Sequence, residues 1–258
     1  EYRVLKDYSA STNSAALWFN QTHKDPVLRS LFQNNMFRIA LSLGINREEI
    51  NHLIFLGLGE PCQGLLNESH PAYVEEINKV YTEYDPAEAN RILDSLGLTE
   101  RDKDGYRLRS DGKAIAITII AFNHQPTSVD TGQLVAGYWK DLGIKAVVNP
   151  LEESLLWTRL EANEFEVLAY GITDGVEPLI DQYHAPLIHW CPLWRLWLDT
   201  GGKSGEEPPE EVKRLWEIYT EEAMATTSEE ERNILIREIM SIHSENLWIV
   251  GTVNIPWM

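Results

Sequence analysis

Residues 84–118 constrain the fold of this chain most, because they place a capped helix directly before a β-hairpin. Asp85 can accept hydrogen bonds from the first free amides of a helix that starts at Pro86. Glu88 stands three residues after this cap, where a glutamate can reach back to the amide of the capping residue. The helix carries one apolar stripe and ends at Gly97, so we expect it to be short and to bury a single face.

Two turn dipeptides, Asp104-Gly105 and Asp111-Gly112, follow this helix. Aspartate followed by glycine suits tight turns, because glycine accepts backbone conformations that other residues avoid. Apolar and polar residues alternate at 106–108 and again at 115–119. This alternation is typical of strands with one buried face, and it predicts a half-buried hairpin.

The rest of the chain alternates predicted helices with predicted strands. Residues 174–209 show no periodicity, and Ser228 followed by Glu231 predicts the start of a last long helix. A helix between two strands implies a parallel pair with a crossover connection, so the pattern indicates an α/β fold. Apolar spacing predicts helices at 26–43, 47–54, 72–81, 134–142 and 152–163, and strands at 144–148 and 165–172.

Composition excludes several classes of partner. The chain has 258 residues, of which 43% are hydrophobic, and a formal net charge of −18. Such a charge opposes binding to nucleic acid or to an anionic membrane surface. The sequence holds no apolar run long enough to span a bilayer, and it starts at Glu1 without a methionine or a signal peptide, so we expect a trimmed chain.

The cysteines leave two alternatives open. Cys62 and Cys191 could form a disulfide in an oxidising compartment, or they could pack as buried thiols. The spacing of His184, His189 and Cys191 fits no closed zinc pattern, so no metal and no cofactor is expected.

Several segments resemble one known family. The helix and hairpin at 84–118 occur in the same order in the family 5 extracytoplasmic solute-binding proteins, which are receptors of ABC importers for oligopeptides, dipeptides, nickel complexes and some oligosaccharides. Residues 37–50 are similar to the arginine-alanine helix and "IDREEI" helix start of that family, although Asn46 replaces the usual aspartate. Either residue caps a helix. Residues 139–145 and 165–168 resemble its helix-to-strand junction and the strand before its ligand loop.

The resemblance implies a fold of the type II periplasmic-binding-protein class, an α/β second lobe in which helices flank a mixed sheet. Residues 1–24 would then hold a hinge or crossover strand from a missing first lobe, 25–246 the ligand-binding second lobe, and 247–258 the returning hinge strand. The full-length receptor would be a monomer, periplasmic or extracellular and membrane-anchored, that delivers its ligand to a membrane permease.

The resemblance also implies a binding loop after the strand that ends near Ile172. The family carries a Gly-Asp-x-x-Asp-Pro-like loop there, whose first aspartate pairs with the α-amino group of a peptide in peptide-binding members. Asp174 falls on this position, Glu177 replaces the second aspartate, and Tyr170 and Thr173 stand next to them. The alternative is that Asp174 only satisfies amides of its own turn. Its carboxylate would also accept sugar hydroxyls.

The densest aromatic cluster of the chain lies at 189–197. Indole rings stack on sugars and pack around apolar peptide side chains, so Trp190 and Trp194 are candidate ligand contacts. The spacing of Trp190, Trp194 and Trp197 also fits one helical face packed in the core, which we expect for Trp197 in particular.

A binding protein is therefore the leading hypothesis, with oligopeptides as ligand and oligosaccharides as the alternative. A glycoside-cleaving enzyme would need two carboxylates facing one pocket. Glu152 and Glu153 are more typical of a solvated helix start, and no G-x-S-x-G nucleophile motif occurs. No catalytic residue is predicted.

Overall fold

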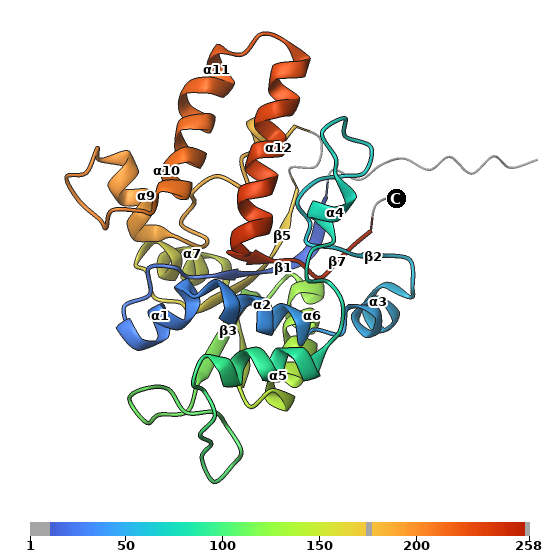
Figure 1. Ribbon diagram of the computed structural model, residues 1–258, viewed down its shortest axis with the longest axis vertical. Coiled ribbons are helices and arrows are strands. Elements are labelled where there is room, and N and C mark those ends of the chain that lie inside the picture. Colours follow the sequence, from blue (N-terminus) through green and yellow to red (C-terminus); the bar gives the residue numbers. More distant parts are fainter. Residues whose placement is uncertain (1–10, 174–176, 256–258) are drawn as a thin grey trace, which may run out of the picture.

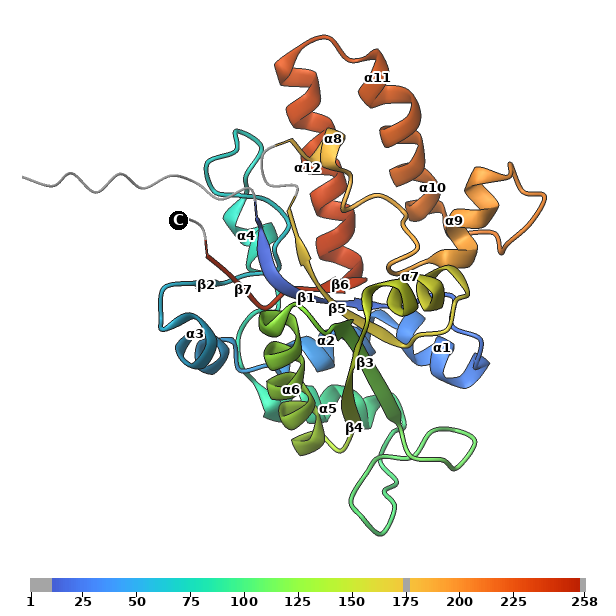
Figure 2. The same ribbon diagram turned by 180° about the vertical axis from the view of Figure 1, so that it is seen from behind.

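The computed structural model describes residues 11–173 and 177–255. A five-stranded mixed sheet lies at the centre, in the order β4-β3-β5-β1-β6, and helices cover both of its faces (Figure 1, Figure 2). This arrangement confirms the predicted α/β class. The strands of this sheet are β1 (Asn13–Phe19), β3 (Ala116–Phe122), β4 (Lys145–Leu151), β5 (Val167–Ile172) and β6 (Ile249–Val250), and a separate ladder pairs β2 (Glu60–Pro61) with β7 (Val253–Asn254).

The helices divide between the two faces of the sheet. Helices α2, α5 and α6 lie on one side, and α7, α9, α10 and α12 lie on the other (Figure 2). The helical segments are α1 (Pro26–Gln33), α2 (Asn35–Leu43), α3 (Arg47–Phe55), α4 (Glu75–Asn78), α5 (Pro86–Ser95), α6 (Pro126–Asp141), α7 (Glu153–Glu161), α8 (Pro178–Asp181), α9 (Pro192–Asp199), α10 (Glu210–Glu217), the π-helical turn Ile218–Glu222, α11 (Ala223–Ala225) and α12 (Glu229–Asn246).

Side-chain caps start the helices where the sequence predicts them. Asp85 accepts from the amide of Glu88 at 2.8 Å at the start of α5. Asn46 caps α3 in the same way, and Ser228 accepts from the amide of Glu231 at 3.1 Å at the start of α12. Each cap satisfies an amide that the helix itself leaves unpaired.

Three predicted elements differ from the structure. The helix expected at 26–43 is two helices, because Asn34 leaves the helical conformation and caps α2 through the amide of Met36. The helix expected at 72–81 is reduced to α4. Residues 106–108 form no regular strand, because the amide of Arg107 donates to the carbonyl of Gly143. The expected hairpin is nevertheless partly present: the amide of Ile115 donates to the carbonyl of Arg107, that of Arg109 donates to the carbonyl of Lys113, and Leu108 bridges to Ala114.

The predicted parallel pair at 144–148 and 165–172 also needs correction. Both segments are parallel strands, β4 and β5, but they are not neighbours. Strand β3 lies between them and pairs with both, with Ala116 opposite Lys145 and Ile119 opposite Val167. The first residues of β3 were assigned to the predicted hairpin, so the sequence analysis did not predict β3 as a third parallel strand.

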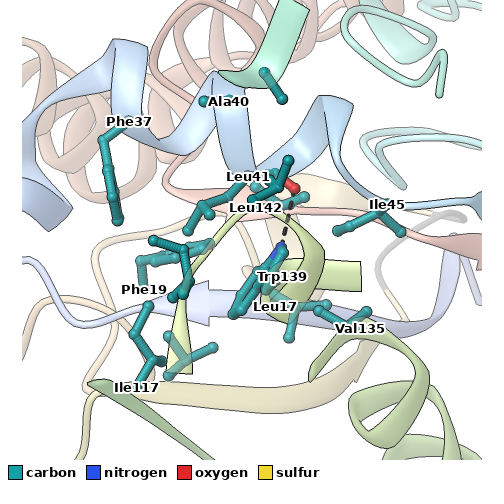
Figure 3. Packing of buried hydrophobic residues seen from close by; sticks show 14 of the residues in the cluster. Leu17, Phe19, Phe37, Ala40, Leu41, Ile45, Ile117, Val135, Trp139 and Leu142 are labelled. Carbon is teal, nitrogen blue, oxygen red and sulfur yellow. Dashed lines mark hydrogen bonds between the residues drawn. The ribbon is translucent and has the colours of Figure 1, made fainter. Parts of the chain in front are cut away.

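The first core packs the sheet against α2, α5 and α6 (Figure 3). Phe19 from β1 and Trp139 from α6 lie in contact, with ring centroids 5.9 Å apart. The indole nitrogen of Trp139 donates to the carbonyl of Leu41 at 3.0 Å, which fixes α6 against α2. This core is otherwise mostly aliphatic.

The second core lies on the opposite face and is rich in aromatic rings. Trp190 stacks on Trp248 with centroids 4.9 Å apart and an interplanar angle of 18°. His243 of α12 packs edge-on against both indoles. The structure therefore places in this second core side chains that the sequence analysis considered for ligand contact.

The two segments expected to connect to another lobe are adjacent. Strand β1 pairs with β6 in antiparallel fashion, with Leu17 opposite Val250 and Trp18 opposite Ile249. The returning segment is not one continuous strand, because it turns at Gly251 and continues as β7. The buried guanidinium of Arg47 donates to the carbonyl of Gly251 through Nε at 3.0 Å and Nη2 at 2.8 Å.

Cys62 and Cys191 are both buried free thiols, so the disulfide alternative is not realised. Among residues 11–173 and 177–255, no helix is long and apolar enough to cross a membrane.

Candidate ligand-binding site

Four half-buried rings meet near the carboxyl end of β5, and we call them the aromatic floor: Trp157, Tyr170, Tyr183 and His189. The ring of Tyr170 is nearly parallel to that of Tyr183, at 6.4 Å and 20°, and to that of His189, at 5.7 Å and 19°. Trp157 meets His189 edge-on at 5.5 Å. The carboxyl ends of parallel strands are the usual place for ligand sites in α/β proteins.

Buried neighbours hold the aromatic floor in place. Trp18 of β1 lies against His189 with centroids 5.5 Å apart, and its indole nitrogen donates to the carbonyl of Tyr170 at 3.0 Å. Phe122 of β3 contacts Tyr170 and Trp157 at 5.5 Å and 5.7 Å. Three strands of the central sheet thus position these rings.

The aromatic floor is uncharged at neutral pH. Burial lowers the pKa of His189 to about 4, so its imidazole is neutral. Burial, followed by the proximity and hydrogen bond of Tyr183, raises the pKa of Tyr170 to about 12, so its phenol keeps its proton. The buried Nδ1 of His189 has no hydrogen-bond partner among the described residues.

Three of the predicted site residues lie at this end of the sheet. Tyr170 belongs to the aromatic floor, and Thr173 is exposed directly after β5. Glu177 stands at the start of α8, and its buried Oε1 has no hydrogen-bond partner in the described part of the chain. Asp174 lies outside the described residues.

The predicted tryptophans lie at the other end of the sheet. Strands β1 and β5 are antiparallel, so Gln21, which follows β1, lies beside the amino end of β5. The amide of Gln21 donates to the carbonyl of Trp190, whose side chain is 0% exposed. Trp194 is 6% exposed. The structure does not bring these indoles together with Tyr170 and Thr173, and their contact with a ligand stays a prediction.

Trp194 lines an open cavity of about 620 Å³ with Gln21, Arg38 and residues 206–211. Three of the acidic side chains around this cavity are in ion pairs, and Arg38 donates to backbone carbonyls and to Gln21. Arg29 binds both carboxylate oxygens of Glu206, at 2.7 and 2.8 Å, and Lys213 binds Glu207 at 2.6 Å and Glu210 at 2.8 Å. The paired charges make this cavity a weaker candidate site than the aromatic floor.

Sequence reasoning missed Trp157 and Tyr183 and considered His189 only as a metal ligand. Within the described residues, no group of three or more histidine, cysteine or acidic side chains could hold a metal ion. For Trp157 a signal was available: Leu156 and Leu160, its neighbours on the same side of α7, are buried, so this side of the helix faces the sheet. For Tyr183, inside an aperiodic tract, no sequence signal was available.

The profile of one protein family, the bacterial extracellular solute-binding proteins, family 5, middle portion, matches residues 2–185. The chain belongs to this family. The match covers β1 through the segment that carries Tyr183, so it includes most of the aromatic floor.

Individual relatives agree with this membership. Residues of this chain are 30% identical to the probable ABC transporter periplasmic-binding protein SapA of Escherichia coli K12, over 69% of this chain and 31% of that protein. The solved structure of an oligopeptide-binding protein OppA superposes with a TM-score of 0.88 and 36% identity, covering 98% of this chain and 42% of that one. The stachyose complex of MelB from Agrobacterium fabrum C58 has a TM-score of 0.72 at 18% identity, covering 96% and 39%.

The chain spans 31% of the length of SapA and 30% of that of another curated relative, a probable ABC transporter-binding protein of Deinococcus radiodurans. These relatives are named as binding proteins of ABC transporters. They support the family and the fold, and they leave the ligand of this chain open.

Proposed function

We propose that this chain is the second lobe of a receptor for an ABC importer, and that the receptor binds oligopeptides outside the cytoplasm and passes them to a membrane permease. The 36% identity to an oligopeptide-binding protein across 98% of the chain is the observation that carries this proposal. Ligand would lie between this lobe and another, and the paired strands β1 and β6 would act as the hinge on which the lobes close.

The proposed peptide site lies at the carboxyl end of β5. Asp174 would pair with the α-amino group of the peptide, and Thr173 and Glu177 flank it in the sequence. The buried Oε1 of Glu177 has no partner among the described residues, which supports this position, because a buried carboxylate oxygen in that state favours a ligand with hydrogen-bond donors. The family implies binding and not catalysis.

An oligosaccharide is the second candidate ligand, and the aromatic floor favours it. Sugar rings stack on flat aromatic faces, and Tyr170 and Tyr183 present two nearly parallel rings in a half-buried position. MelB, which shares the fold, is described in complex with stachyose.

Calorimetry on the full-length receptor tests the peptide proposal. Replacing Asp174 with asparagine keeps the size of the side chain and removes its charge, so peptide binding should weaken by about 2 to 5 kcal/mol. Oligosaccharide binding should weaken less, since an amide still bonds to hydroxyls. The matched control is Asp181→Asn, on the exposed side of α8, which should leave affinity unchanged.

The outcomes separate the candidates. Peptide affinity that is equal in the wild type, Asp174→Asn and Asp181→Asn would contradict the assigned role of Asp174. Tight binding of oligosaccharides without measurable peptide binding would replace the first candidate by the second. Turnover of a peptide or glycoside would contradict a purely binding function.

A further inference from the structure

The aromatic floor has a geometry that favours one shape of ligand group. The ring of Tyr170 is nearly parallel to that of His189, at 5.7 Å, and to that of Tyr183, at 6.4 Å. All three are half-buried, so each keeps some exposed surface. Flat rings in a row offer a stacking surface to another ring, whereas a branched aliphatic chain makes fewer contacts with such a surface.

The chemistry of the floor selects against charge. His189 is held neutral by burial, and Tyr170 and Tyr183 share a hydrogen bond between their side chains. A charged ligand group placed here would lose hydration without gaining an opposite charge from these rings. The floor therefore favours an uncharged group over an anionic one.

One polar atom within the floor lacks a partner. Nδ1 of His189 is buried and makes no hydrogen bond to any described residue, while the ring that carries it contacts Trp18, Trp157 and Tyr170. A buried polar atom without a partner costs free energy, and a hydrogen-bonding group of a ligand removes that cost.

We propose that the aromatic floor is a subsite for an uncharged ring that carries a hydroxyl group, which stacks on Tyr170 and Tyr183 and pairs its hydroxyl with Nδ1 of His189. The phenol ring of a tyrosine in a peptide and the pyranose ring of a sugar share this chemistry. This inference rests on the proposed function, because it assigns a ligand group to the same end of the sheet. It adds a specificity-determining residue, His189, that the family resemblance does not supply.

Small uncharged probes test the subsite on the 258-residue chain itself. N-acetyl-tyrosinamide, N-acetyl-phenylalaninamide, N-acetyl-leucinamide and methyl glucoside are titrated by NMR saturation transfer and by tryptophan fluorescence, since Trp18 and Trp157 both contact His189. We expect the tyrosine probe to bind at least threefold more tightly than the phenylalanine probe, and the leucine probe to bind weakest. Equal affinity for the tyrosine, phenylalanine and leucine probes would overturn the proposal.

Matched variants identify the groups that bind. Tyr183→Leu removes a stacking face and should weaken the tyrosine probe at least fivefold. Its control, Tyr84→Leu, changes a tyrosine that is 48% exposed and lies beside Tyr138, away from the floor, and should have no effect. His189→Phe keeps a ring but removes the nitrogen, and it should bring the tyrosine probe to the affinity of the phenylalanine probe. Circular dichroism checks that each variant is folded.

The two ring sources and the two proposals give distinct results. Tight binding of methyl glucoside in place of the tyrosine probe would identify the sugar as source, and loss of that binding in His189→Phe would still support the subsite. A tyrosine preference that persists in His189→Phe would overturn the role of His189. If the full-length receptor binds peptides but this chain shows no ring preference, the subsite is overturned and the proposed function stands. If this chain binds the ring probes but the full-length receptor binds neither peptide nor sugar, the proposed function is overturned and the subsite stands.

Discussion

The two faces of the central sheet are built in different ways. The face under α2, α5 and α6 is mostly aliphatic, and its one buried indole, that of Trp139, has its hydrogen-bond partner. The opposite face carries the aromatic floor together with buried polar atoms that have no hydrogen-bond partner among residues 11–173 and 177–255, such as Nδ1 of His189 and of His243. The first face can stabilise the fold, so the second face can carry the unpaired groups that we propose to contact a ligand.

The largest loss of stability is expected from a substitution in the first face. Trp139→Ala removes a fully buried indole and leaves a cavity, so the free energy of unfolding should fall by about 3 to 5 kcal/mol. The matched change on the second face, Trp157→Ala, affects a half-buried ring and should cost about 1 kcal/mol while weakening ligand binding. Denaturant unfolding monitored by circular dichroism measures both, and equal losses would contradict the division of roles.

A somewhat smaller effect should come from the side chain that ties α3 to the segment after β6. Arg47→Met leaves the buried carbonyl of Gly251 without its two guanidinium donors, and should cost about 3 kcal/mol. Arg91→Met, at a side chain that is 73% exposed, is the control and should change stability by less than about 0.5 kcal/mol. If both variants unfold at the same denaturant concentration as the wild type, the contact to Gly251 does not stabilise the fold.

Lowering the pH should reduce the stability of the protein through the buried histidines of the second face. Burial lowers the pKa of His189 to about 4, and burial together with neighbouring His184 lowers that of His243 well below 6.5. The unfolded chain takes up protons near pH 6.5 and the folded chain does not, so stability falls as the pH drops below 6.5, by about 1 kcal/mol per pH unit for each buried histidine.

Thermal unfolding between about pH 7 and pH 5 checks this direction, above the range in which carboxylates titrate. His189→Phe should reduce the slope of stability against pH, and His124→Phe, at an exposed ring, should not. A stability that is constant over this range, or that rises toward acid, would contradict the neutral state of the buried histidines.

The smallest expected effect concerns the start of α12. Ser228→Ala removes the acceptor for the amide of Glu231 and should cost about 1 kcal/mol. Ser228→Asp, which keeps an acceptor and adds a negative charge at a helix amino end, should preserve or raise stability. A larger loss in Ser228→Asp than in Ser228→Ala, measured by denaturant unfolding, would show that the cap is not what holds this helix end.

Local signals in the sequence predicted much of the first face. Caps at Asp85 and Asn46, and the apolar stripe between Pro86 and Gly97, depend on residues close in the chain, and the structure confirms these elements. The break at Asn34 was missed because the apolar spacing continues through it. The place of β3 between β4 and β5 depends on pairing between distant residues, which periodicity does not report.

The candidate site was harder to predict. Tyr170, Thr173 and Glu177 came from the family resemblance, and the structure places them at one end of the sheet. The aromatic floor draws Tyr183 and His189 from an aperiodic tract and joins them to a strand and a helix far away in the sequence. Trp190 looked like a ligand contact because of its ring, yet its neighbours Trp248 and His243 bury it.

The aromatic floor is assembled from separate pieces of chain, and this has a consequence for evolution. Trp157 comes from α7, Tyr170 from β5, and Tyr183 and His189 from the connection between α8 and α9. A mutation at Tyr183 changes one ring of the aromatic floor while the sheet and its first core keep their packing. Under the proposed function, single exchanges in this connecting loop would change which ligands such a receptor binds, while the first core keeps its packing.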